Sequence, residues 1–401
     1  MGFNRRDRSA LLVPPAYESG SLGDEAALVG ACQYLRQQGM TKVGIVSFEV
    51  ADNWGYDTLR PFFDEVVVLP NYQIDVESFV TAARYYQRVF CLGADMMDGY
   101  YADSDTLRIT QLVALAADAG AMTSLISFSF NNQPTAASVA ALNHLPNSVR
   151  YAVRDPLSCD RLKRHLARPL TLTADLAFLL ASDDASLRVQ SVQRWMRQQQ
   201  QAHRIIIGIN INNLHLTALP SRRADELMGL YRDALVEVAK TYSNLSLLLI
   251  PHDQRGKISD VSLAKDLYAA LPVSLQDHSL PVPFPCSAAE IKAICAGLDG
   301  ALTGRMHLAI ACLGQRVPVV GIAYQNKFEG LFHHFNLNPQ ELSLEPHRAF
   351  QPGAIAPLLS HLLAHRADFR QTIQTALPHV QQLAAANFPS ISASASVGSY
   401  K

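Results

Sequence analysis

The sequence lacks an excess of charge of either sign. Its 401 residues carry 34 Lys and Arg against 35 Asp and Glu, which gives a formal net charge of −1. Proteins that bind nucleic acid through their overall charge need a net basic face, so we expect no nucleic-acid partner. A local anion site is still compatible with this balance, because a small ligand needs only two or three cations.

Long apolar runs and paired cysteines are also missing. No stretch approaches the ~18 apolar residues of a membrane span, and the run at 11–15 is too short for a signal peptide. Arg6 stands where a myristoylation motif has Ser or Thr. The six cysteines are scattered without a CxxC pair, which indicates reduced core residues rather than disulfides or a zinc site. We therefore expect a cytoplasmic protein without a bound metal.

The composition is that of a globular chain, and its length predicts two domains. Hydrophobic residues make up 49% and charged residues 17%, a balance far from that of disordered proteins. Short β-branched runs alternate with helical patterns, which is typical of a parallel sheet covered by helices. In the first half, we predict strands at 9–15, 42–48, 65–70, 88–93 and 124–130, with helices at 25–38 and 109–117.

A long polar helix predicted at 183–203 separates two similar halves. In the second half, we predict strands at 204–212, 245–253, 300–304 and 317–324, with helices at 224–242, 288–296 and 307–313. The fold class is therefore α/β, with two doubly wound Rossmann-like domains, 1–182 and 183–388, facing a central cleft. The Ser-rich segment 389–401 is predicted to be a disordered tail.

The segment 298–332 contains a predicted anion site at the start of a helix. Thr303 is a good N-cap, and Gly314 stands where a left-handed C-cap is favoured. The backbone N–H groups from Gly304 to Met306 would then have no partner inside the helix. Such a helix N-terminus binds phosphate or carboxylate groups well.

Four side chains surround this predicted helix start. Arg305 supplies a planar, bidentate donor for anions, and His307 supplies a group that titrates near neutral pH. The buried strand that follows brings Tyr324 and Lys327 to the same rim of the sheet. A lone Arg or His in such a place is usually a solvated or structural residue. Their combination points to an anionic substrate.

The segment 303–332 resembles the C-terminal signature of the polysaccharide pyruvyl transferases. In that signature an Arg-x-His opens a helix, a Gly-x-x-x-Pro segment follows, and a strand ends in Tyr with a Lys downstream. The matching residues are Arg305, His307, Ala311, Gly314, Pro318, Tyr324 and Lys327. Segments 21–28, 153–158, 174–178 and 247–253 are similar to further family segments in the same order. The chain departs from the family at Ser21, where Asn is frequent, and in lacking glycine clusters near 91–99 and 126–132.

The resemblance implies a GT-B-like fold and a reaction. Pyruvate would move from phosphoenolpyruvate (PEP) to two hydroxyls of a sugar in a cell-surface glycan or its lipid-linked precursor, forming a cyclic ketal without a cofactor. It implies that His307 is the acid/base, and that Arg305 with Gly304 and Met306 at the helix N-terminus holds the anionic donor. Arg154 would reach in from the first domain.

Other candidate residues each have two interpretations. Lys327 either pairs with an anion or caps a loop, and Asp24 either contacts the acceptor or serves as an N-cap. His252 either faces the cleft or is a hydrogen-bonded structural histidine. Asn210 would either bind a substrate or form a turn. The pair 333–334 looks like metal ligands, yet adjacent residues on a helix point in different directions, so we expect no metal there.

Alternative functions and partners remain open at this point. A GT-B-type glycosyltransferase would use the same cleft for a nucleotide-sugar. A family member without activity would serve as a saccharide-binding subunit. The basic run 161–168 and the arginines of 183–203 either contact a membrane that carries a lipid-linked acceptor, at the inner face, or form a solvated surface. The sequence does not define the oligomeric state.

Overall fold

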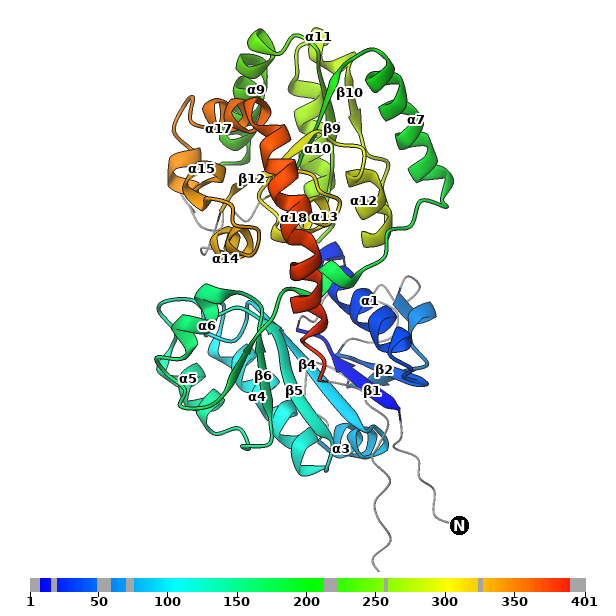
Figure 1. The fold of residues 1–401 in the computed structure, drawn as a ribbon, viewed down its shortest axis with the longest axis vertical. Helices are drawn as coiled ribbons and strands as arrows, with labels where there is room; N and C mark the ends of the chain where they lie inside the picture. Colours follow the sequence, from blue (N-terminus) through cyan, green and yellow to red (C-terminus); the bar gives the residue numbers. More distant parts are fainter. Residues whose placement is uncertain are drawn as a thin grey trace, which may run out of the picture.

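Two parallel sheets flanked by helices make up the protein, one above the other in Figure 1. The computed structural model describes residues 8–15, 20–48, 59–69, 76–212, 223–255, 259–323 and 327–389. All statements below refer to these residues.

The first domain contains a seven-stranded sheet. Its strands are β1 (Ser9–Val13), β2 (Lys42–Ser47), β3 (Glu65–Val68), β4 (Arg88–Ala94), β5 (Met122–Phe128), β6 (Arg150–Val153) and β7 (Leu170–Leu172). Its helices are α1 (Leu22–Gln37), α3 (Val76–Tyr85), α4 (Asp103–Asp118), α5 (Ala136–Asn143) and α6 (Pro156–Leu162), with 3₁₀ turns η1 (Arg60–Phe62) and η3 (Leu176–Leu179). The strand order is β3-β2-β1-β4-β5-β6-β7, and all neighbours are parallel.

The second domain contains a six-stranded parallel sheet. Its strands are β8 (Ile205–Ile209), β9 (Leu245–Leu249), β10 (Ser279–Pro281), β11 (Gly300–Thr303), β12 (Val319–Ile322) and β13 (Ser343–Leu344), in the order β10-β9-β8-β11-β12-β13. The helices before α14 are α7 (Leu187–Gln201), α9 (Ala224–Thr241), α10 (Asp260–Ala270), α11 (Val273–Gln276), α12 (Ala288–Cys295) and α13 (Met306–Gly314). The remaining helices are α14 (Lys327–His334), α15 (Pro339–Leu342), α16 (Pro346–Ala349), α17 (Ile355–Ala364) and α18 (Arg366–Ala385).

Both sheets have the Rossmann strand order, as predicted. In each one the chain starts in the middle, builds one half, and returns to build the other, so a switch point lies between β1 and β4 and between β8 and β11. The central strands are buried along their whole length, which explains their continuous apolar sequences. The sequence analysis did not predict the short strands β6, β7, β10 and β13.

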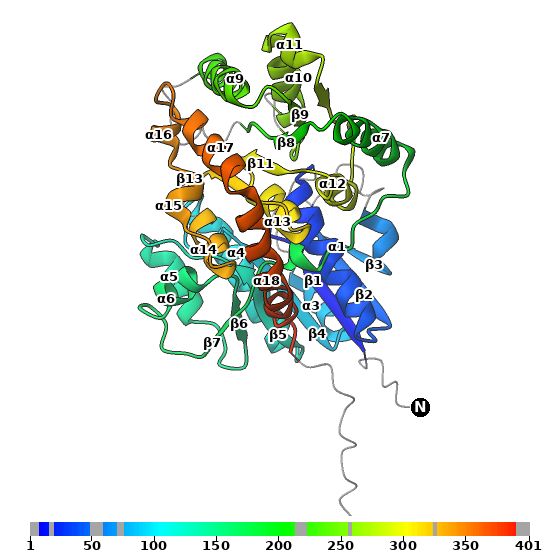
Figure 2. The same cartoon turned by 45° about the horizontal axis from the view of Figure 1, so that its top comes forward.

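The domains share one continuous apolar core. Helix α1 of the first domain packs against α12 and α13 of the second, and η3 packs against α13. The neighbouring positions of α1, α12 and α13 are visible in Figure 2. A mainly apolar contact of this kind holds the rims of the two sheets close to each other.

The C-terminal helix α18 leaves the second domain and runs to the first, as the red helix in Figure 1 shows. After it, the Asn387 side chain accepts a hydrogen bond from Ser127 N and donates one to Ala174 O. The Phe388 ring packs against Tyr34 and Phe90. Residues 387–388, which the sequence analysis assigned to the second domain, are therefore built into the first. The predicted tail lies outside the described residues except for position 389.

The six cysteines are buried and free, in agreement with their prediction as reduced core residues. Among the described residues, no helix is both long enough and apolar enough to cross a membrane.

Candidate functional site

A pocket opens between the two domains, where the carboxyl ends of strands from both sheets meet. It encloses about 1090 Å³, its open mouth included. Predicted site residues that line it are Asp24, Arg154, His252, Arg305, Met306, His307 and Lys327. A narrower pocket beside it shares Asp95, Arg154, Met306 and Lys327. The predicted convergence of these side chains is therefore present in the structure.

His307 and Arg154 meet on one carboxylate. Asp175, the N-cap of η3, places Oδ2 3.6 Å from His307 Nε2 and 3.0 Å from an Arg154 guanidinium nitrogen. Arg154 also donates to Ser129 Oγ at 2.9 Å. Burial alone would raise the pKa of Asp175, but His307 and Arg154 outweigh it and hold that pKa below its usual range. Asp175 thus links a first-domain arginine to a second-domain histidine.

The start of α13 differs from its prediction. Arg305, not Thr303, is the N-cap, and the helix begins at Met306. The Thr303 hydroxyl accepts a hydrogen bond from Arg305 N at 2.9 Å, so that N–H is not available to a ligand. The first-turn N–H groups without a partner inside the helix are those of 306–308. These N–H groups lie further along the chain than predicted, Gly304 contributes no helical N–H, and anion binding at this helix end stays a prediction.

The end of α13 also corrects a prediction. Gly314 is the last helical residue and not a left-handed C-cap. The positive φ of +64° belongs to Arg316, two residues further on. Gly314 instead lies close to the Lys292 side chain, since a Cβ there would stand 3.3 Å from Lys292 Cε.

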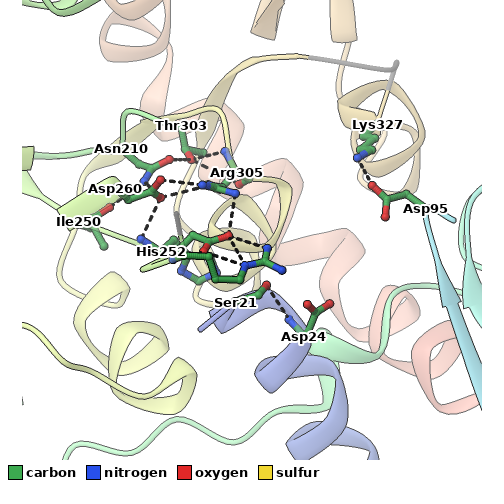
Figure 3. A network of polar contacts seen from close by, with 12 residues as sticks. Ser21, Asp24, Asp95, Asn210, Ile250, His252, Asp260, Thr303, Arg305 and Lys327 are labelled. Atoms are coloured by element: carbon green, nitrogen blue, oxygen red, sulfur yellow. Dashed lines mark hydrogen bonds and ion pairs between the residues drawn. The ribbon is translucent and has the colours of Figure 1, made fainter. Parts of the chain in front are cut away.

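Arg305 is held by two carboxylates of its own domain (Figure 3). Its guanidinium lies 3.0 Å from Asp253 Oδ2 and 2.7 Å from Asp260 Oδ1, and its side chain is 12% exposed. Burial raises the pKa of Asp260 despite the nearby Arg305. These contacts fix the direction of the guanidinium, which still lines the pocket.

Asn210 lies behind the site, contrary to its prediction as a substrate ligand. It is 1% exposed, and its amide nitrogen donates to Ile250 O and to Asp260 Oδ2. Its amide oxygen accepts from the Thr303 hydroxyl at 3.0 Å. With both ends of the amide used by the protein, Asn210 orients Asp260 and Thr303, the neighbours of Arg305, and the turn interpretation also does not describe it.

Lys327 is the first residue of α14 and spans the cleft. Its ammonium group pairs with Asp95, which follows β4 of the first domain, and lies 3.2 Å from the Tyr101 hydroxyl. Burial would raise the pKa of Asp95, but Lys327 and Arg154 lower it below its usual range. Lys327 thus pairs with a carboxylate of the protein itself, and its pairing with an anionic ligand stays a prediction.

Asp24 lies in the first turn of α1 and is not its N-cap. Ser21 is the cap, with its hydroxyl accepting from Asp24 N at 3.3 Å. The Asp24 carboxylate lines the pocket, where burial raises its pKa against the opposing effects of Arg255 and His307. A carboxyl group with a raised pKa suits contact with substrate hydroxyls.

His252 follows β9 and lies in the pocket wall, 3% exposed. Neither of its ring nitrogens makes a hydrogen bond to another described residue. The alternative of a hydrogen-bonded structural histidine is therefore wrong for the ring. Burial, together with the positive neighbours His307 and Arg305, lowers the pKa of His252 to about 3.

The remaining candidates that the structure describes do not line this pocket. Tyr324 lies outside the described residues. The His334 ring contacts the backbone oxygen of Arg154 at 2.9 Å. In the basic run 161–168, Arg161 lies 3.9 Å from Glu329, and Arg168 bonds to residues of its own domain. Much of this run is thus used within the protein.

The sequence analysis missed the acidic partners of the site. Asp95 and Asp253 stand at the ends of predicted strands, where the rim position was a usable signal. Asp175 lies in the segment 174–178 that resembles a family segment. Asp260, at the start of α10, gave no signal. Arg255 bonds to Asp253 at 2.8 Å and was also missed.

Fold and site together define a two-domain GT-B-like protein with an interdomain cleft. Staphylococcus aureus MnaA in complex with UDP has a TM-score of 0.60 at 10% identity, covering 94% of each chain. UDP-GlcNAc 2-epimerase from Neisseria meningitidis, bound to UDP-GlcNAc, has a TM-score of 0.55 at 11% identity, covering 94% of this chain and 97% of that one. A ugt transferase from Siraitia grosvenorii in complex with UDP gives 0.55 at 8% identity, covering 93% and 95%. At these identities the likeness shows the fold alone.

The family follows from the sequence. The polysaccharide pyruvyl transferase family model matches residues 22–326, and the chain belongs to this family. The resemblance carried by 303–332 is thereby confirmed. No curated protein sequence matches the chain.

Proposed function

We propose that this protein transfers pyruvate from PEP to two hydroxyl groups of a saccharide, free or lipid-linked, and so forms a cyclic ketal. The observation that carries the proposal is the convergence of Arg154, Arg305, His307 and Lys327, from both domains, on one pocket. PEP carries a phosphate and a carboxylate, and cations with helix N–H groups are the partners that such an anion needs. Family membership supports the reaction class.

Binding of the donor would use cations that already point at the pocket. Arg154 is held by Asp175, Arg305 by Asp253 and Asp260, and Lys327 by Asp95. Such pairs keep the cations in position in a partly buried site, and an arriving polyanion shares or replaces the carboxylate contacts. The N–H groups at the start of α13 add a partial positive charge at the same place.

The chemistry needs a proton donor close to the donor substrate. His307 would protonate the methylene carbon of PEP, leaving an oxocarbenium-like centre at the neighbouring carbon. A sugar hydroxyl attacks that centre, phosphate leaves, and the second hydroxyl closes the ketal. One proton is gained by the methylene and two are released by the hydroxyls. Asp175, 3.6 Å from His307, is placed to hold the imidazole and balance its charge.

The acceptor would approach from the first domain. Asp24 lies at the start of α1 opposite His307 and faces the same pocket. Gly23, beside it, leaves room for the His307 ring, because a Cβ there would stand 2.3 Å from His307 Nδ1. This close approach of α1 to His307 supports a reaction in which the acceptor reaches the donor from the first domain.

The proposal is tested by incubating the protein with PEP and a panel of methyl pyranosides that differ in diol geometry. Phosphate release is followed by ³¹P NMR, and the ketal is identified by mass spectrometry. We expect ketal formation with at least one pyranoside, lost in His307→Gln and retained in the exposed control His144→Gln. Absence of phosphate release with every pyranoside, while PEP binds, would contradict ketal transfer to simple sugars.

A further inference from the structure

The His252 imidazole is buried in the pocket wall without a hydrogen-bond partner. It is 3% exposed, and neither ring nitrogen bonds to any residue in the described ranges. A neutral imidazole has one N–H and one lone pair, and leaving a buried polar group unpaired costs ~1–3 kcal/mol. A buried polar group that stays unpaired despite this free-energy cost is typical of a site where a ligand supplies the missing hydrogen bond.

The backbone of His252 makes hydrogen bonds to residues of both domains. His252 N donates to Asp260 Oδ2 at 3.1 Å, and Asp260 in turn holds Arg305. His252 O accepts from Leu22 N, the first residue of α1, at 3.3 Å. The backbone of His252 is therefore held by groups of both domains, and the residue lies in the pocket wall.

The two histidines of the pocket have opposite surroundings. His307 faces the carboxylate of Asp175 at 3.6 Å. His252 lies near the positive groups His307 and Arg305, which together with burial outweigh the opposing Asp253 and hold its pKa far below neutrality. These surroundings disfavour the charged form of His252 and leave a neutral imidazole, whose lone pair can accept a proton.

We propose that His252 is the catalytic base of the ketal-forming reaction, accepting the proton of an acceptor hydroxyl. The inference rests on the proposed function. As the hydroxyl oxygen uses a lone pair to bond to the oxocarbenium-like carbon, its O–H electron pair stays on oxygen and the proton moves to the imidazole lone pair. The proton then passes to the departing phosphate, and the proton of the second hydroxyl restores His307. In this reaction His307 has just given its proton to the methylene, and its Nε2 lies 3.6 Å from Asp175.

The bound donor makes this base effective. Without the donor, burial and the neighbours His307 and Arg305 oppose a positive charge on the His252 ring. The phosphate and carboxylate of PEP would offset those charges, so the imidazole can take a proton only when the donor is in place. Leu22 and the Ser21–Asp253 bridge join the start of α1 in the first domain to the segment that carries His252.

The charge state and contacts of His252 are measured by NMR on protein with isotope-labelled histidines. His252→Gln and His252→Asn both assign the resonance, and exposed His144→Gln is the matched control. We expect a neutral ring from about pH 5 to 8 in the free protein. With PEP present, we expect methyl pyranosides to shift the His252 resonance. A ring that titrates near pH 6.5 without PEP, or that no pyranoside of the panel perturbs, would overturn the proposal.

Kinetics separate this role from donor binding. With the best pyranoside of the panel, His252→Gln should lower kcat by ~100-fold or more while the Kd for PEP changes less than about twofold. Near-normal turnover in His252→Gln, or a parallel loss of PEP affinity, would show that His252 is not the base. Failure of the wild type to bind PEP would instead contradict the proposed function, and the free-protein titration would still decide the charge state of His252.

Discussion

Asp175 of the first domain lies 3.6 Å from Nε2 of His307 in the second. This carboxylate joins the domains at the place where the proposed acid stands, and it also holds Arg154. A single side chain of the first domain thus contacts both the histidine and a cation of the same pocket. Its position could not be inferred from the histidine's own sequence segment.

Asp175→Asn removes the negative charge that lies between His307 and Arg154. We expect the affinity for PEP to fall, because Arg154 loses its anchor, and kcat to fall by ~100-fold or more, because His307 loses its partner. Pairing lowers the folded-state pKa of Asp175, so its contribution to stability is present at neutral pH and is lost as the pH falls below ~4. Urea unfolding at pH 7 and at about pH 3 should show the difference between wild type and Asp175→Asn shrinking. A difference that grows in acid would be inconsistent with the pairing.

The Lys327–Asp95 pair links α14 to the first domain across the cleft. Lys327→Met should destabilise the protein toward the low end of the ~3–5 kcal/mol of a broken buried pair, because Asp95 retains 25% exposure. The double variant Lys327→Met/Asp95→Asn should recover part of that loss. The cycle is measured by urea unfolding, and the exposed pair Lys163–Asp160 serves as control, with no measurable coupling expected. Strict additivity at 327 and 95 would show that the two groups do not interact.

Asn210 can be tested for its role in positioning the neighbours of Arg305, as opposed to direct contact with PEP. Because its amide bonds only to protein groups, Asn210→Ala should lower stability by ~1–3 kcal/mol. The Kd for PEP should change far less than in Arg305→Gln. Titration calorimetry with PEP and unfolding of the same samples give both numbers. A large loss of PEP affinity without a loss of stability would restore Asn210 as a direct ligand.

Glu25 makes the interface between the domains sensitive to pH. Its carboxyl accepts a hydrogen bond from Ala288 N at 2.7 Å. Burial raises the pKa of Glu25 from 4.5 to about 7; the bond from Ala288 acts against this rise, and the nearby Glu290 adds to it. Between these two values the folded state retains a proton that the unfolded state releases, so stability falls as the pH rises. Glu25→Gln should therefore be more stable than wild type at pH 8, by up to ~3 kcal/mol, and nearly equal at pH 5. Exposed Glu237→Gln, measured in the same way, should show no such change, and an equal gain at both pH values would refute the shifted titration.

The sequence was sufficient to predict the fold class, but not the strands at the edges of the two sheets. Central strands such as β1 and β9 are continuous apolar runs, and their pattern is unambiguous. Edge strands β7 and β13 have three and two residues, too few to show any periodicity. The return of residues 387–388 to the first domain rests on tertiary contacts that no local pattern reveals.

The sequence predicted the cationic residues of the candidate site, but it did not predict the carboxylates that pair with them. Arg305 and His307 lie two residues apart, so one motif contains both. Asp95 and Lys327 are 232 residues apart, and only the folded chain brings them together. The N-cap of α13 was misplaced by two residues because the Thr303 hydroxyl bonds to Arg305 N and to Asn210 instead of capping the helix.

The central claim is that the pocket between the domains binds PEP, and a thermal-shift measurement tests it most directly. Wild type, Arg305→Gln and the exposed control Arg194→Gln are compared with PEP and with a panel of nucleotide-sugars. A ligand at ~100 times its Kd adds ~2.7 kcal/mol to folding stability, which raises the Tm visibly. We predict that PEP raises the Tm of wild type and Arg194→Gln but not of Arg305→Gln, and that no nucleotide-sugar does so. A rise with a nucleotide-sugar and none with PEP would contradict the account and favour a glycosyltransferase.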